Sequence, residues 1–202
     1  MKKKYKAEHT DLDIKNTTPC KVILDKIRGD LDGMDREHAI ETLLLVFEIR
    51  AFCTPSDLET CLNMLYDLVS ADDIVYQSDI KLIKLSLSLL NQEHSVSTME
   101  ILGRMIYSIV LDTYLAKQTL PDDIYKQVLK VARNILLNKK ESDPYIVVPI
   151  IETLLYCEKK HTRPILNQFI SSLKKETIIS RVAKAALEGK HCHGDDDYPL
   201  LI

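Results

Sequence analysis

The chain has 202 residues but no tryptophan, only 5 glycines and 7 prolines, and 6% aromatic residues. So little glycine excludes a collagen-like chain. The low content of glycine and of aromatic residues also argues against a β-sandwich or barrel, which needs a turn about every 8–12 residues. The hydrophobic content of 46% is far above that of a disordered chain. The length therefore suits a single globular domain with a core of useful size.

Long apolar runs are missing as well. Charge-free apolar stretches such as residues 105–111 and 145–151 are short, whereas a transmembrane helix needs about 18 residues or more. The basic start of the chain, Met1–Lys6, is followed by polar residues and not by an apolar segment. We therefore expect neither a membrane span nor a secretory signal.

The charge balance is nearly even, with 27 Lys+Arg against 30 Asp+Glu and a formal net charge of -3. A chain of this charge has no global attraction to nucleic acid, so we do not expect nucleic acid as the main partner.

The cysteines form an odd and scattered set. They are Cys20, Cys53, Cys61, Cys157 and Cys192. Three of them, Cys53, Cys61 and Cys157, lie in apolar helical patterns and are expected to act as small hydrophobic residues. The pattern predicts no disulfide framework and a reducing compartment, either cytoplasmic or nuclear.

Catalytic signatures do not occur. The sequence has no G-x-S-x-G, no glycine-rich phosphate loop, no H-E-x-x-H and no calcium-binding loop. The acidic pairs at 72–73 and 122–123 stand at expected helix starts, where the helix dipole favours negative charge. We therefore predict a protein that is not an enzyme and that needs no cofactor.

Helical periodicity fills most of the chain. We expect a flexible basic and polar leader over residues 1–17, one α-helical domain over 18–188 and an acidic flexible tail over 189–202. Helix starts are marked by a capping residue followed by proline, as at Thr54-Pro55 and Asp143-Pro144. Helices of 12–22 residues joined by short loops predict antiparallel neighbours.

The sequence also predicts the type and the ends of particular helices. Residues 80–90 alternate apolar and polar over a few positions, but the wider spacing favours a helix over a strand. The helix that carries Phe47 is expected to continue to Phe52, and another to begin at His161–Pro164. Pro149 is expected to kink its helix or to separate the first turn.

Similar apolar segments recur along the chain. Residues 62–69, 105–110 and 150–157 begin 43 and 45 residues apart, and a second apolar set lies between them at 82–90, 128–136 and 165–173. A two-helix unit of about 40–47 residues is the period of HEAT and armadillo arrays.

Over residues 18–187 the chain resembles the HEAT/armadillo class of α-helical repeats, on this period and on the capped starts at Pro55, Pro121 and Pro144. It departs from HEAT units in lacking a Val-Arg step after Asp73 or Asp79. The resemblance implies an all-α fold of antiparallel helix pairs stacked as a short solenoid. A compact helical bundle is the alternative.

Such an architecture predicts a scaffold, adaptor or regulatory subunit that binds a protein partner on a helical surface. Tyrosines on exposed helix faces could supply the contact area, although each could equally border the core; we single out Tyr66, Tyr107, Tyr114, Tyr125 and Tyr156. A basic group on one expected helix, Lys126, Lys130 and Arg133, is a second candidate surface. One alternative function is a bundle that sequesters an amphipathic helix of a signalling partner. The other is a nucleic-acid accessory factor.

The sequence also suggests a metal site and an import signal. Cys157 and His161 could chelate zinc together with Cys192 and His193, against the simpler interpretation of a buried cysteine and exposed histidines. The basic terminus could be an import signal; its residues are Lys2, Lys3, Lys4 and Lys6. Apolar residues near the end of the periodic region also suggest a larger complex or a homo-oligomer.

Overall fold

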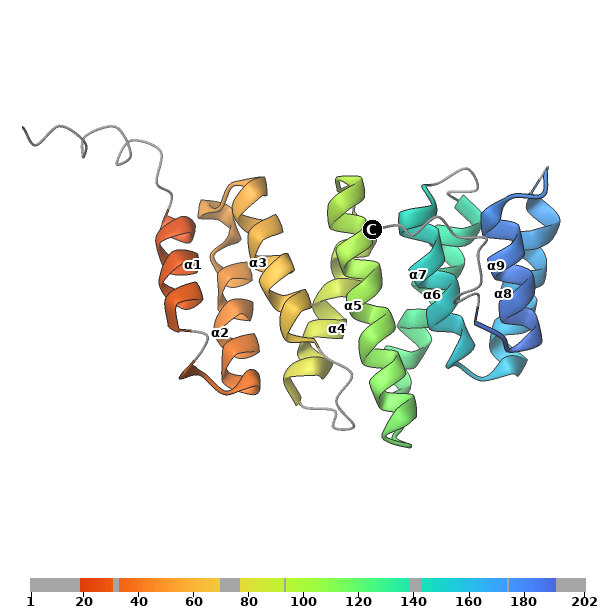
Figure 1. Ribbon diagram of the computed structural model, residues 1–202, viewed down its shortest axis with the longest axis horizontal. Coiled ribbons are helices and arrows are strands. Elements are labelled where there is room, and N and C mark those ends of the chain that lie inside the picture. Colours follow the sequence, from red (N-terminus) through yellow and green to blue (C-terminus); the bar gives the residue numbers. More distant parts are fainter. Residues whose placement is uncertain are drawn as a thin grey trace, which may run out of the picture. The chain divides into compact units, whose positions relative to one another are not determined.

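The computed structural model describes residues 19–30, 33–69, 77–92, 94–138, 143–173 and 175–191. Within these ranges every regular element is a helix and there is no strand, which confirms the all-α prediction. The chain forms two compact units, residues 1–61 and 62–202, and the division falls inside helix α3, Pro55–Leu68 (Figure 1). The expected leader over 1–17, and the part of the acidic tail from residue 192 onward, lie outside the described residues.

The first unit contains α1 (Pro19–Asp30), α2 (Arg36–Glu48), a short 3₁₀ helix η3 (Arg50–Phe52) and the first residues of α3. Helix α1 packs against α2 and η3. Its buried side chains recur at positions 20, 24 and 27, the spacing of one helix face. The α-helix predicted to reach Phe52 ends at Glu48, because the chain tightens into η3 before it turns toward α3.

A disulfide joins Cys20 of α1 to Cys53, whose Cα atoms are 5.3 Å apart. The prediction of a chain without disulfides is therefore wrong, and Cys53 is a bonded residue and not a free small hydrophobe. The 33-residue separation of the two cysteines carries no spacing signal, so only the packing of α1 beside η3 reveals the pair. The bond also removes the main argument for a reducing compartment.

The second unit holds α4 (Gln77–Leu90), α5 (Val96–Leu115), α6 (Asp122–Asn138), α7 (Pro144–Leu155), α8 (Lys159–Ser172) and α9 (Ile178–Glu188). Helix α7 packs between α5 and α9, and α6 packs between α4 and α8. Each helix of one row also contacts the other row through the pairs α4–α5, α6–α7 and α8–α9 (Figure 1). Two rows of helices therefore enclose the core.

Local sequence explains where these helices begin. The segment at 80–90 lies in α4, as predicted, and Ser95, Asp143 and Thr177 cap the next helices by accepting backbone N–H bonds. The capped proline starts at Pro55 and Pro144 are confirmed as the first residues of α3 and α7. Helix α8 begins at Lys159, two residues before the predicted start.

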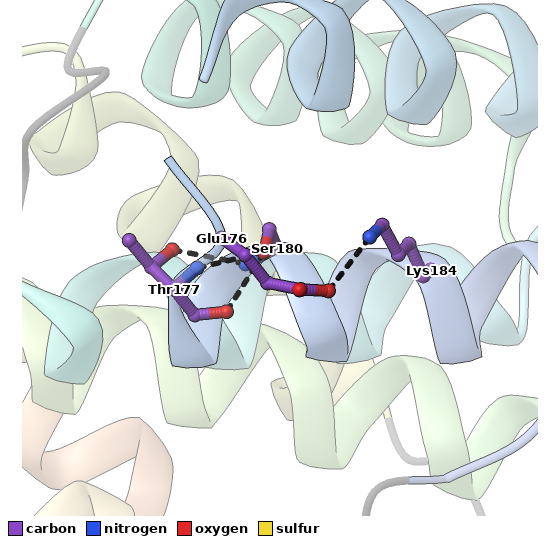
Figure 2. A network of polar contacts seen from close by, with 4 residues as sticks. All are labelled: Glu176, Thr177, Ser180 and Lys184. Carbon is purple, nitrogen blue, oxygen red and sulfur yellow. Dashed lines mark hydrogen bonds and ion pairs between the residues drawn. The ribbon is translucent and has the colours of Figure 1, made fainter. Parts of the chain in front are cut away.

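The start of α9 shows how such a cap is built (Figure 2). The Thr177 hydroxyl accepts from the Ser180 N–H at 3.2 Å, and the Thr177 N–H donates to the Ser180 hydroxyl at 2.9 Å. Lys184 Nζ donates to Glu176 Oε1 at 2.8 Å across the next turn. These reciprocal bonds satisfy backbone groups that have no partner inside the helix.

A glycine of α5 faces a proline of α7. A Cβ on Gly103 of α5 would lie 3.5 Å from the Pro149 Cβ of α7. Pro149 is buried, and α7 is one continuous helix on both sides of it, so its first turn is not separated. The wide apolar face of α7 is thus shared between α5, α6 and α9.

No helix in the described ranges is both long enough and apolar enough to pass through a bilayer.

Candidate functional site

A pocket of about 260 Å³ opens in the second unit where three segments meet. They are the C-terminal end of α5 with the following loop, the first turn of α6, and the junction between α7 and α8. The lining residues are Val110, Thr113, Tyr114, Gln118, Thr119, Leu120, Asp122, Tyr125, Tyr156, Cys157 and Glu158. We call it the tyrosine pocket, after three of them.

The end of α5 shapes one wall of this pocket. Lys117 adopts a left-handed conformation with φ 54°, which is uncommon for a residue with a side chain. The turn is closed by the Lys117 N–H on the Tyr114 carbonyl at 3.0 Å and the Gln118 N–H on the Thr113 carbonyl at 2.9 Å. The helix ends at this turn, and residues 118–120 of the following loop line the pocket together with Tyr114.

Aromatic rings pack around the pocket. The rings of Tyr114 and Tyr156 have centroids 5.2 Å apart and planes tilted by 52°. Tyr107, two turns before Tyr114 on α5, also contacts Tyr156, with centroids 6.0 Å apart. His191 packs on Tyr156 as well, with its Nε2 2.6 Å from the tyrosine hydroxyl. Tyr156 is thus held on several sides, whereas Tyr114 is 59% exposed.

Tyr125 links α6 to the start of α8. Its hydroxyl accepts a hydrogen bond from the Glu158 N–H at 3.1 Å and lies 3.1 Å from His161 Nδ1. Because the hydroxyl oxygen accepts from Glu158, its own proton can be donated to a neutral His161 ring. These bonds fix the α7–α8 junction against α6.

Three tyrosines at or beside the pocket, Tyr107, Tyr125 and Tyr156, have a pKa above the ordinary tyrosine value. Burial is the main cause that raises the pKa of Tyr125 and Tyr156 above the ordinary tyrosine value, and it raises that of Tyr107 as well. For Tyr107 the neighbouring Tyr156 hydroxyl adds to the effect of burial. Phenol groups that resist ionisation present π faces and hydroxyls, not negative charge.

The fixed charges of the pocket are two carboxylates, Asp122 and Glu158, and no lysine or arginine is among the residues that line it. Lys160 sits beside Glu158 with an Nζ–Oε2 distance of 2.6 Å, and this contact lowers the pKa of the exposed Glu158 carboxyl. Asp122 forms no ion pair within the described part of the chain, while its neighbour Asp123 pairs with Lys84. The pocket is therefore aromatic with an acidic edge.

Only two of the four residues of the zinc site suggested by the sequence, Cys157 and His161, lie in the described part of the chain. Cys157 is buried, its thiol donates to the Thr153 carbonyl, and burial raises its pKa to about 12. His161 is exposed and bonded to Tyr125. Among the described residues no three metal-binding side chains come together. Cys192 and His193 lie outside the described residues.

The other predicted positions fall in separate places. Lys126, Lys130 and Arg133 share an exposed face of α6, where Arg133 reaches Gln168 of α8 at 3.5 Å. They do not line the pocket. Tyr66 is half-buried and contacts Arg104, whose Nε and Nη2 bind Glu100. The basic residues at 2–6 lie outside the described residues.

Sequence reasoning singled out the tyrosines but missed that Tyr114, Tyr125 and Tyr156 share one pocket, and it missed Glu158 and His191. The seven-residue spacing of Tyr107 and Tyr114 was an available signal, because it places both on one helix face. No protein family, curated protein or solved structure matches the chain.

Proposed function

We propose that the protein is a non-enzymatic interaction module, a scaffold or regulatory subunit, and that it binds a protein partner through the tyrosine pocket. The observation that carries the proposal is the position of Tyr114 and Leu115, which are 59% and 47% exposed beside an aromatic-lined hollow. Tyrosine is enriched among the residues that dominate binding at interfaces. A rigid ring beside a pocket supplies contact area with little loss of side-chain freedom.

The size of the pocket supports a single side chain as the occupant. Pockets for whole small molecules span about 300–1,000 Å³, and this one has about 260 Å³. The nearby exposed Leu115 would then contact the residue next to the one that enters the pocket. Recognition of a partner segment follows from this arrangement, with the charged residues around it as a polar rim.

The proposal includes the arrangement of the helix pairs as a short solenoid. Two features of the second unit support it: α5, α7 and α9 contact one another in order, and so do α4, α6 and α8. Stacked helix pairs of a HEAT or armadillo array produce this pattern of contacts. The basic face of α6 is a second possible partner surface, and the acidic edge of the tyrosine pocket disfavours a phosphate backbone there.

Site-specific photo-cross-linking tests the proposal. A photoreactive phenylalanine at position 114 is compared with the same group at position 130, on the basic face of α6. In extracts of the native cell, a discrete protein adduct at 114 and none at 130 supports binding at the pocket. An adduct at position 130 alone would indicate that the partner binds the basic face of α6 and not the pocket. The absence of an adduct at both positions would contradict the proposal.

A further inference from the structure

We propose that the tyrosine pocket accepts an arginine side chain from a basic segment of the partner. The inference deepens the proposed function and rests on it. Its basis is the combination of two tilted aromatic rings, two carboxylates from separate segments, and the absence of lysine and arginine from the residues that line the pocket.

The rings favour a cation. Tyr114 and Tyr156 both line the pocket, and their ring planes are tilted by 52°. A guanidinium is attracted to the face of a tyrosine when it lies within about 6 Å of the ring centroid. Because burial raises the pKa of Tyr156, its ring keeps a neutral phenol through the physiological range. The attraction therefore comes from the π face and not from a phenolate.

The carboxylates favour a guanidinium over an ammonium. Asp122 comes from the start of α6 and Glu158 from the residue before α8, so they approach the pocket from separate elements. Arginine carries five N–H donors in a rigid plane, and it can stack on a ring while it donates to a carboxylate. Lysine is a compact charge that is strongly hydrated, and it cannot do both in one plane.

Lys160 does not block this use of Glu158. The Nζ–Oε2 pair is on the surface, with the side chains 70% and 58% exposed. Ion pairs of this kind are weak and screened by salt, so an incoming guanidinium can exchange with the lysine. Asp122 has no ion pair within the described residues to exchange. An incoming guanidinium would thus meet one carboxylate in a weak surface pair and one without an ion pair in the described part of the chain.

Four capped hexapeptides provide the probes: Gly-Ser-Leu-Arg-Ser-Gly and the same sequence with lysine, citrulline or glutamate in place of arginine. Citrulline keeps the shape of arginine and removes its charge. Binding to the full-length protein is measured by calorimetry and by the shifts of ¹³C-labelled tyrosine rings. We expect arginine to bind best, lysine about three- to tenfold more weakly, and citrulline at least tenfold more weakly. We expect no binding of the glutamate peptide.

Matched variants locate the site. Asp122→Asn and Glu158→Gln are expected to weaken the arginine peptide about threefold or more each. Their controls are Asp123→Asn in the same turn and Glu188→Gln, whose carboxylate pairs with Lys190 as Glu158 pairs with Lys160. The controls should change affinity less than twofold, and circular dichroism should show equal helix content in all four.

Three results overturn the inference: citrulline binding as well as arginine, lysine binding as well as arginine, or equal losses in the controls and the pocket variants. If the peptides fail in this way while position 114 still cross-links to a partner, the arginine inference alone is wrong. If position 114 does not cross-link, the proposed function fails with it.

Discussion

Tyr114 and Tyr156 meet with ring centroids 5.2 Å apart, although 42 residues of sequence separate them. Their contact joins the end of α5 to the end of α7, and the pocket lies beside it. The Tyr114 ring is the more exposed of the two. The Tyr156 ring also contacts Tyr107 and His191. The proposed function assigns the contact with a partner to Tyr114, the more exposed of the two rings.

Removing the Tyr125 hydroxyl should loosen the α7–α8 junction. Tyr125→Phe deletes the acceptor of the Glu158 N–H and the partner of His161. A single hydrogen bond of this kind contributes about 1 kcal/mol, so the free energy of unfolding should fall by about 0.5–1.5 kcal/mol in urea titration. Tyr114→Phe is the matched control, because no described residue bonds to its hydroxyl. An equal loss in both variants would contradict this role of Tyr125.

Loss of the disulfide should destabilise the first unit. Cys20→Ser leaves α1 without its covalent tie to Cys53, 33 residues away. Loop-closure entropy assigns a cross-link of that span about 4 kcal/mol in the free energy of unfolding. Hydrogen exchange of residues 19–48 in oxidised protein should report the change, with Cys192→Ser as control. Unchanged protection in Cys20→Ser would show that packing alone holds α1.

Two glycines should respond to alanine in opposite directions. Gly103 is inside α5, where a Cβ would make ordinary contact with Pro149, so Gly103→Ala should stabilise the protein by about 0.5–1 kcal/mol. Gly189 ends α9 with φ 78°, so Gly189→Ala should cost about 1 kcal/mol. Thermal unfolding measures both. A loss of stability in Gly103→Ala would mean that α5 and α7 cannot accommodate even a methyl group.

The two buried thiols should be unreactive until the chain unfolds. Burial raises the pKa of Cys61 and of Cys157 to about 12. At pH 8 only about one thiol in 10⁴ is then ionised. In a Cys192→Ser background, Ellman's reagent should find these two thiols only after guanidinium is added. Rapid labelling of the native protein would contradict the burial of Cys61 and Cys157.

The same thiols set the sign of a pH dependence. Because their folded pKa lies above the unfolded value, they contribute stability below about pH 9. That contribution is lost as the pH rises from about 9 to 12, where the unfolded state releases protons first. Urea midpoints at pH 8 and pH 10 should show the decrease, and replacing both cysteines by alanine should reduce the pH dependence. A midpoint that rises between these pH values would contradict the assignment.

The repeat interpretation can be tested by shape. A compact chain trimmed to residues 19–191 has a radius of gyration of about 16 Å. A solenoid of stacked helix pairs is more elongated and should give a larger value in small-angle scattering. A value at or below about 16 Å would favour the compact bundle.

Much of the fold could be predicted from local chemistry. Thr54 illustrates why: its hydroxyl accepts from the Asp57 N–H, and Asp57 accepts in return from the Thr54 N–H, so four neighbouring residues define the start of α3. The observed end of α2 and the observed start of α8 differ from the predicted positions. Both depend on contacts elsewhere in the chain, at the 3₁₀ turn and at the Glu158 junction.

The pocket and the disulfide could not be predicted in the same way. Tyr114, Tyr125 and Glu158 come from three segments, and nothing in their spacing reports that the segments meet. Cys20 and Cys53 are likewise brought together only by the packing of α1 beside η3. Helix periodicity identifies which faces are buried, but several pairings of such faces satisfy the same pattern.

Binding at the tyrosine pocket predicts a specific pattern of hydrogen exchange when the chain is in complex with its cross-linked partner. We expect slower exchange at the end of α5 with its following loop, residues 112–120, and at the α7–α8 junction, residues 155–161, and no change on the basic face of α6. Protection confined to residues 126–133, with the pocket segments unchanged, would show that the partner does not bind at the tyrosine pocket.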